Sequence, residues 1–155
     1  MRHIWQLWLY VWAAPGTCVG LTAALVALQR GARFQVVDGV LEVACPHVIR
    51  WISRFTAVGA PISAITLGHV VVAESLEALD ATRRHERIHV RQYERWGPLF
   101  IPAYFVASGW AWSRGRHPYL DNPFEVEAFA LSVPPRDADP PLAAQGAAAD
   151  WWARD

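Results

Sequence analysis

The chain has little cysteine and no net charge. Its two cysteines, Cys18 and Cys45, form neither a zinc-binding motif nor a disulfide framework. The formal net charge is zero, so nothing in the composition favours nucleic acid as a partner. A length of 155 residues indicates one domain that is long enough to bury a core. Hydrophobic residues make up 54% of the chain, which is high for a soluble protein and favours contact with lipid.

Charge is also absent from a long N-terminal segment. No residue from Ile4 to Leu28 is charged, and a helix of that length can span a bilayer. Pro15 and Gly16 interrupt the segment and predict a kink or two half-helices. A membrane helix, a cleaved signal peptide and a buried core helix are the three interpretations, and the basic start typical of a signal peptide is not clear. We expect residues 1–30 to form a hydrophobic helix that anchors the protein in a membrane.

Two later segments lack charge or a regular hydrophobic pattern. Residues 98–112 carry no charge, but they are short for a span and contain Pro102 and Gly109, so we expect a core helix, with a membrane-dipping helix as the alternative. From residue 134 to residue 155 the chain is rich in Pro, Ala and Asp without periodicity, which predicts a disordered tail.

The β-structure is expected between these segments. Residues 34–44 read as a hairpin around Asp38-Gly39, which is a favoured two-residue turn. Residues 62–73 are the candidate for a third strand, in which Gly68 marks a bulge or a close backbone approach.

The strongest chemical signal is the sequence H-E-x-x-H at His85, Glu86 and His89. On a helix, two histidines four residues apart lie one above the other and can direct their ring nitrogens at one zinc ion. Glu86 lies beside them, where it could take a proton from a water molecule at the metal. A chance match in a chain of this composition has a probability on the order of one in a hundred. The motif therefore needs a helix and a third ligand to support it.

The helix is well supported by its sequence. Residues 74–96 contain no Gly or Pro, and the Gly-Pro pair at residues 97–98 is a typical end signal. Ser75 or Asp80 could cap its start. Both motif histidines and Gln92 fall on the apolar face, so Gln92 is either a hydrogen-bond partner of a ligand or an ordinary boundary residue.

A third ligand is expected from a second helix. Asn122 followed by Pro123 reads as an N-cap and a first helical position, so Glu125 and Glu127 lie in the first turns. Glu125 is the favoured metal ligand and Glu127 the alternative, although Asn122 and Glu125 also fit a capping box. The remaining options are His117, Asp121 or no third ligand.

The H-E-x-x-H-x-x-Q and N-P-F-E-x-E-A motifs together resemble gluzincin-type zinc metallopeptidases, and most of all small bacterial membrane-associated zincin-like proteins. The resemblance covers residues 62–131. In this family the third ligand is a Glu followed three residues later by a small residue, which favours Glu125 with Ala128. The next position usually holds an Asp or Asn that orients a ligating histidine. Here it is Phe129, so another residue, such as Asn122, would have to take that role.

The resemblance implies an α+β fold. It predicts a minimal zincin-like domain at residues 31–133, with a small sheet of a hairpin plus one strand packed on the motif helix and a second, ligand-bearing helix. With the hydrophobic N-terminal helix, it also implies attachment to the bacterial inner membrane. In zincins the strand before the motif helix binds the substrate backbone, so residues 67–70 would line the groove. His69 within them reads better as a strand histidine with satisfied hydrogen bonds than as a catalytic one.

The implied activity is hydrolysis of a peptide or protein at a single Zn²⁺. His85, His89 and Glu125 (alternatively Glu127) would hold the metal, and Glu86 would act as general base. Tyr119 is the expected donor to the oxyanion, with Tyr104 and His117 as alternatives. Two other hypotheses remain. One is a non-catalytic membrane-associated domain with a structural or vestigial zinc site, and the other is a metal-free helical membrane protein with an accidental motif.

Overall fold

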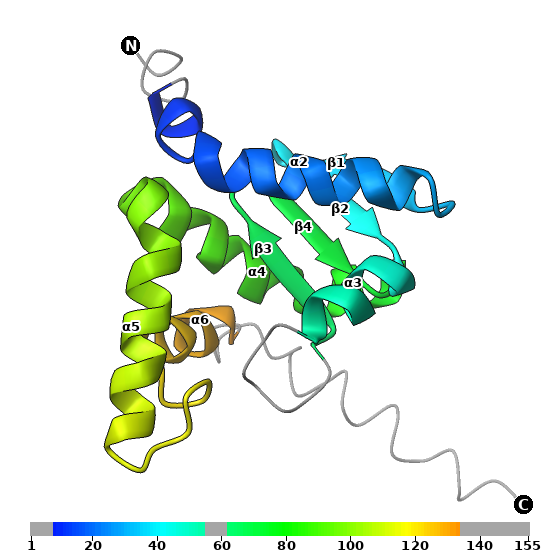
Figure 1. The fold of residues 1–155 in the computed structure, drawn as a ribbon. Helices are drawn as coiled ribbons and strands as arrows, with labels where there is room; N and C mark the ends of the chain where they lie inside the picture. The colour runs from blue at the N-terminus through cyan, green and yellow to red at the C-terminus, as the bar shows by residue number, and fades with distance from the viewer. Residues whose placement is uncertain (1–7, 55–61, 134–155) are drawn as a thin grey trace, which may run out of the picture.

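The computed structural model describes residues 8–54 and 62–133, which form an α+β fold around one mixed sheet (Figure 1). Helices cover both faces of the sheet, with α2 and α3 on one face and α4 on the other. The elements are α2 (Ala14–Leu28), β1 (Arg33–Val37), β2 (Val40–Ala44), α3 (Pro46–Ser53), β3 (Ala64–Leu67), β4 (Val70–Ala73), α4 (Leu76–Trp96), η1 (Gly97–Leu99), α5 (Phe100–Ser113) and α6 (Pro123–Ser132).

The sheet has the strand order β1-β2-β4-β3. Strands β1 and β2 form the expected hairpin, and positive φ angles at Asp38 (49°) and Gly39 (78°) give it the expected turn chemistry. The prediction of a single strand over residues 62–73 is wrong. Two antiparallel strands, β3 and β4, replace it. Gly68 at φ 65° lies in the tight turn between them rather than in a bulge, and the expected close backbone approach is present, because Thr17 of α2 packs against it. The two hairpins join through the parallel pair β2–β4, which leaves β3 at one edge.

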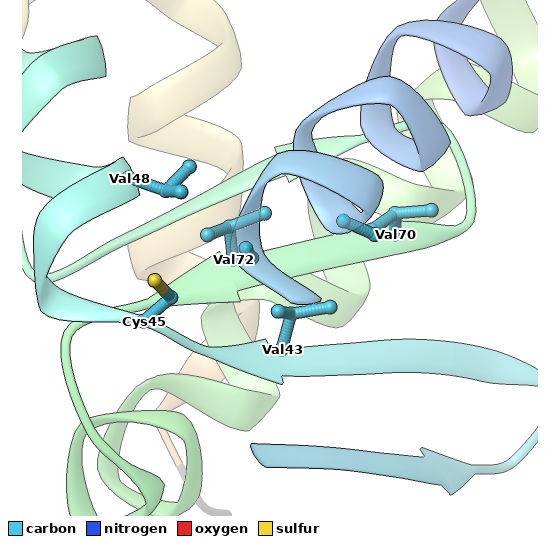
Figure 2. Close-up of a cluster of buried hydrophobic side chains, with 7 residues drawn as sticks. Val43, Cys45, Val48, Val70 and Val72 are labelled. Atoms are coloured by element: carbon cyan, nitrogen blue, oxygen red, sulfur yellow. The ribbon is translucent and has the colours of Figure 1, made fainter. Parts of the chain in front are cut away.

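Strand β4 is the centre of the core because it is buried on both faces. Val70 and Val72 point into a cluster with Val43 and Cys45 beneath α2 and α3 (Figure 2). The alternate side chains of β4 point to the other face, where they pack against α4. The run of four apolar residues in β4 is therefore the pattern of a strand buried on both sides.

Helix α2 packs on the sheet through its small residues. Gly16, Gly20, Ala24 and Ala27 are its buried positions, and a Cβ atom at Gly20 would lie 2.6 Å from the Cβ of Val70. The large apolar residues of α2 consequently face outward. The uncharged segment is not one uninterrupted helix, because a turn at Ala13 separates helical residues 8–12 from α2. Residues 1–7, which begin the expected membrane helix, lie outside the described ranges.

Across residues 8–54 and 62–133, no helix combines the length and the apolar character needed to cross a membrane. Helix α5, expected as a core helix, has exposed residues at half of its positions, and Phe100 and Ala111 are its buried residues. Pro102 is accommodated because it lies in the first turn of α5. The tail expected over residues 134–155 lies outside the described part of the chain.

Polar contacts with Glu42 and His69 are among those that hold α4 against the rest of the fold. Glu42 of β2 is 1% exposed, and its carboxylate accepts hydrogen bonds from Arg83 and Arg87 at 3.0 Å. Farther along α4, the Oε1 of Glu94 lies 3.2 Å from the Nε2 of His69. His69 is buried in the β3–β4 turn, and its backbone N–H donates to the Thr17 hydroxyl of α2. It is therefore a buried histidine with satisfied partners, as expected, although it lies in a turn.

Candidate metal centre

Helix α4 brings the two motif histidines to one point. The Ser75 hydroxyl caps the helix by accepting from the Ala78 N–H at 3.1 Å, so Ser75 rather than Asp80 is the cap. The helix then continues without interruption until Gly97. His85 and His89 lie one turn apart on it, and their Nε2 atoms are 3.0 Å from each other.

Helix α6 supplies the third member of the group. Asn122 caps α6 by accepting from the Phe124 N–H at 3.0 Å, which starts the helix at the expected residue. The Glu125 carboxylate points at the histidines instead of closing a capping box. Its Oε2 lies 3.2 Å from the Nε2 of His85, and its Oε1 lies 3.5 Å from the Nε2 of His89.

These distances suit a single tetrahedral zinc ion. One ligand atom from each of His85, His89 and Glu125 lies within 4.8 Å of the other two. Two ligands that are each about 2.0–2.1 Å from a tetrahedral zinc are about 3.3–3.4 Å apart, close to the separations observed here. Within residues 8–54 and 62–133, the group has no fourth His, Cys, Asp or Glu. Three protein ligands leave one tetrahedral position for water, which is the arrangement of catalytic zinc sites.

The burial of Glu125 is a second sign that these residues fit a cation. Glu125 is 3% exposed, and its Oε2 has no hydrogen-bond donor among the described residues. Burial opposes ionisation of this carboxyl, but the adjacent imidazoles of His85 and His89 and the Tyr104 hydroxyl lower its pKa to about 2. A buried carboxylate that faces two imidazoles and has one oxygen without a hydrogen bond is suited to share a cation with them.

Gln92 holds His89 in position. Its Oε1 lies 2.8 Å from the Nδ1 of His89, so the ring can donate to Gln92 and present Nε2 to the metal. The Gln92 amide in turn donates to the Phe124 carbonyl at 3.0 Å and to the Glu127 carboxylate at 2.8 Å. Gln92 is thus the hydrogen-bond partner of a candidate ligand. Asn122, considered for that role, instead donates to the Tyr104 carbonyl.

The other candidates for the third ligand lie outside the group. The Glu127 carboxylate bonds to Gln92 and to Arg95, the latter at 3.1 Å. His117 is exposed, and its Nδ1 accepts from the backbone N–H of Tyr119 at 3.2 Å. Asp121 accepts from the backbone N–H of His117 at 2.8 Å. His117 and Asp121 therefore stabilise the loop before α6.

Glu86, the expected general base, is 5% exposed and has one hydrogen-bond partner that the motif did not indicate. The Thr66 hydroxyl of edge strand β3 donates to the Glu86 Oε2 at 2.6 Å. Thr66 is itself buried. Its role could not be read from the sequence, because one Thr in an apolar strand carries no distinguishing signal and its partner depends on the sheet register.

Two tyrosines approach the same carboxylate. The Tyr104 hydroxyl of α5 donates to the Glu125 Oε1 at 2.8 Å. Burial and the nearby Glu125 charge raise the pKa of both Tyr104 and Tyr119, so each hydroxyl keeps its proton at neutral pH. Tyr119 lines a cavity beside the candidate ligands. Both are therefore available as hydrogen-bond donors.

A cavity of about 340 Å³ opens beside the three candidate ligands and Glu86. Most of its wall is apolar, and β3 and α5 contribute much of it. Of the groove residues expected at 67–70, Leu67 lines the cavity, whereas Val70 is buried under α2. The apolar wall includes Ile65, Leu67, Phe100, Ile101 and Phe105.

Comparison with known proteins identifies no family for this chain. No family model matches the chain, and no curated protein or solved structure matches it either. The similarity to gluzincins therefore rests on the two sequence motifs, and the metal centre rests on the distances given above.

Proposed function

We propose that the protein is a zinc-dependent metallopeptidase. The observation that carries this proposal is the convergence of His85, His89 and Glu125 within 4.8 Å, beside the acid Glu86 and an open cavity. When bound, zinc would supply Lewis-acid chemistry, which activates water and polarises a carbonyl group. Three ligands instead of four favour this function over a structural zinc site.

Glu86 is the base in this proposal. The Thr66 hydroxyl occupies its Oε2, so Oε1 is the atom that takes a proton from the attacking water. Glu86 then passes this proton to the departing amine, which leaves the carboxylate ready for another turnover. The buried position of Glu86 excludes bulk solvent and makes the proton transfer local.

A peptide is the favoured substrate because strand β3 lies at the sheet edge and lines the cavity. In the part of the chain that the structure describes, the outer edge of β3 pairs with no other strand. Its backbone N–H and C=O groups are suited to hydrogen-bond an extended peptide. Tyr119 would donate to the developing oxyanion, while Tyr104 holds Glu125.

Zinc analysis of the purified protein, combined with a peptide-library cleavage assay, tests the proposal. We expect one zinc per chain, and we expect Glu86→Gln to keep the metal while lowering turnover by at least about a hundredfold. Glu125→Ala should lose zinc, whereas its matched control Glu127→Ala should keep it. Cleavage by Glu86→Gln at the wild-type rate would refute the mechanism. Stoichiometric zinc without turnover would favour the structural or vestigial site instead.

A further inference from the structure

Helices α2 and α3 lie on the face of the sheet opposite α4 (Figure 1). A second cavity is lined by residues of both helices. It is a groove with a volume of about 850 Å³. Ile52 and Leu67 line both this groove and the cavity of the candidate metal centre. The groove is thus close to the proposed active site but contains none of the candidate ligands.

The floor of the groove is apolar. Val26 of α2, Val48 of α3 and Leu67 of β3 belong to it. Outside the groove, on other sides of α2, Leu25 is 66% exposed and Leu28 is 62% exposed. This exposure follows from the packing of α2, which turns its small residues to the sheet and its large ones outward.

The rim of the groove is basic. It carries Arg30 just after α2 and His47, Arg50 and Arg54 on or just after α3, and no Asp or Glu among the described residues lines the groove. Among the residues that the structure describes, none of the three arginines has an ion-pair partner. The arginines of α4 that bond to Glu42 differ in this respect, because their charge is neutralised within the fold.

We propose that this groove and the outer side of α2 bind anionic phospholipid at a bilayer surface. The lipid phosphate pairs with the rim arginines, since a guanidinium group can donate two parallel hydrogen bonds to phosphate oxygens. The acyl chains contact the groove floor and the exposed leucines of α2. A bilayer fits better than an acidic protein segment because α2 also exposes large apolar side chains outside the groove.

The proposal does not depend on zinc or on hydrolysis. It differs from the membrane-spanning helix expected from the sequence, because α2 contacts the lipid with one side while its other side stays packed on the sheet. Leu67 is shared by the two cavities, so lipid binding would place the candidate metal centre next to the bilayer surface.

Vesicle co-sedimentation of the full chain tests this inference. We expect binding to phosphatidylcholine vesicles that contain about 30% phosphatidylserine, and much weaker binding to phosphatidylcholine alone. Binding should fall as salt rises, because the arginines act through charge. The double variant Arg50→Glu/Arg54→Glu should bind at least about tenfold more weakly. Leu25→Ser/Leu28→Ser should also weaken binding, because it removes exposed apolar contacts.

The matched control is Arg84→Glu/Arg91→Glu, which makes the same charge change at exposed positions of α4. It should bind vesicles within about twofold of wild type if the arginines of the groove, rather than the net charge of the protein, determine binding. An equal loss in the control would overturn the proposal. Stronger displacement from vesicles by inorganic phosphate than by sodium chloride at the same ionic strength would assign the rim to a free anion instead. Tighter binding to soluble polyglutamate than to anionic vesicles would overturn it in favour of an acidic protein partner.

Discussion

Replacing Gln92 should separate the two tasks that this side chain performs. Gln92 is 1% exposed and joins three groups through its amide: the His89 ring, the Phe124 carbonyl and the Glu127 carboxylate. Gln92→Leu conserves most of the volume but removes all three hydrogen bonds. The ring of His89 would then lose the partner that fixes its orientation, and α4 would lose a polar link to α6.

The size of the effect follows from these contacts. A hydrogen bond contributes about 1 kcal/mol net, and a buried group left without its partner costs about 1–3 kcal/mol, so Gln92→Leu should lower the free energy of unfolding by about 2–4 kcal/mol. Loss of a hydrogen bond to a ligating histidine typically weakens metal affinity by about 10–100-fold. We therefore expect the folded variant to bind zinc about 10–100-fold more weakly than wild type.

Gln92→Glu is the matched control. It keeps an oxygen that accepts from His89, but it turns a second oxygen toward the Phe124 carbonyl and the Glu127 carboxylate. Zinc affinity should stay within about threefold of wild type, while stability should fall by about 1–3 kcal/mol. Competition with a chromophoric chelator measures the affinity, and urea unfolding of the metal-free protein measures the stability. The reasoning fails if folded Gln92→Leu binds zinc as wild type does, or if both variants weaken zinc equally.

Three further predictions concern stability and turnover. Burial raises the pKa of Glu42, but hydrogen bonds and charge from its arginine partners and a hydrogen bond from Gln35 lower it below the usual 4.5. The stability that ionised Glu42 adds is therefore present above pH 4.5 and lost as the pH falls further. Urea unfolding at several pH values should show a weaker acid dependence in Glu42→Gln. Gly20→Leu should cost at least about 2 kcal/mol, because its side chain meets Val70, whereas Leu25→Ala at an exposed position should cost less than about 0.5 kcal/mol in the same unfolding assay. Thr66→Val should lower peptide turnover at least about tenfold without changing zinc content, and Thr66→Ser should restore most of it; equal rates in the two variants would contradict the role of the hydroxyl.

The features that could be predicted from the sequence are those with local signals. Asp38-Gly39 fixed the hairpin because its turn requires positive φ angles. Ser75 and Gly97 marked the ends of α4, since a side-chain cap and a terminal Gly satisfy backbone groups at those positions. Asn122 started α6 at the expected residue, and the placement of Glu125 among the histidines follows from where that helix begins.

The features that were missed depend on distant contacts. The turn at Gly68 was missed. The expected close backbone approach is present, since Thr17 of α2 packs against Gly68, but no local signal in residues 62–73 indicated two strands instead of one. The packed side of α2 could not be read because an uncharged helix has no polar face to indicate which side is exposed. Thr66 was missed for a related reason: its hydroxyl reaches Glu86 only because β3 pairs with β4 in one particular register.

Polar contacts hold helix α4 to its neighbours at three places along its length. Glu42 bonds to Arg83 and Arg87 near the centre of α4, Gln92 links its last third to α6, and Glu94 lies beside His69 near its end. Because these contacts join α4 to different parts of the fold, the helix cannot rotate about its axis or slide without breaking several of them. The cost of aligning the two imidazoles is therefore met during folding, and a preorganised site of this kind loses little conformational entropy when it takes up a metal ion.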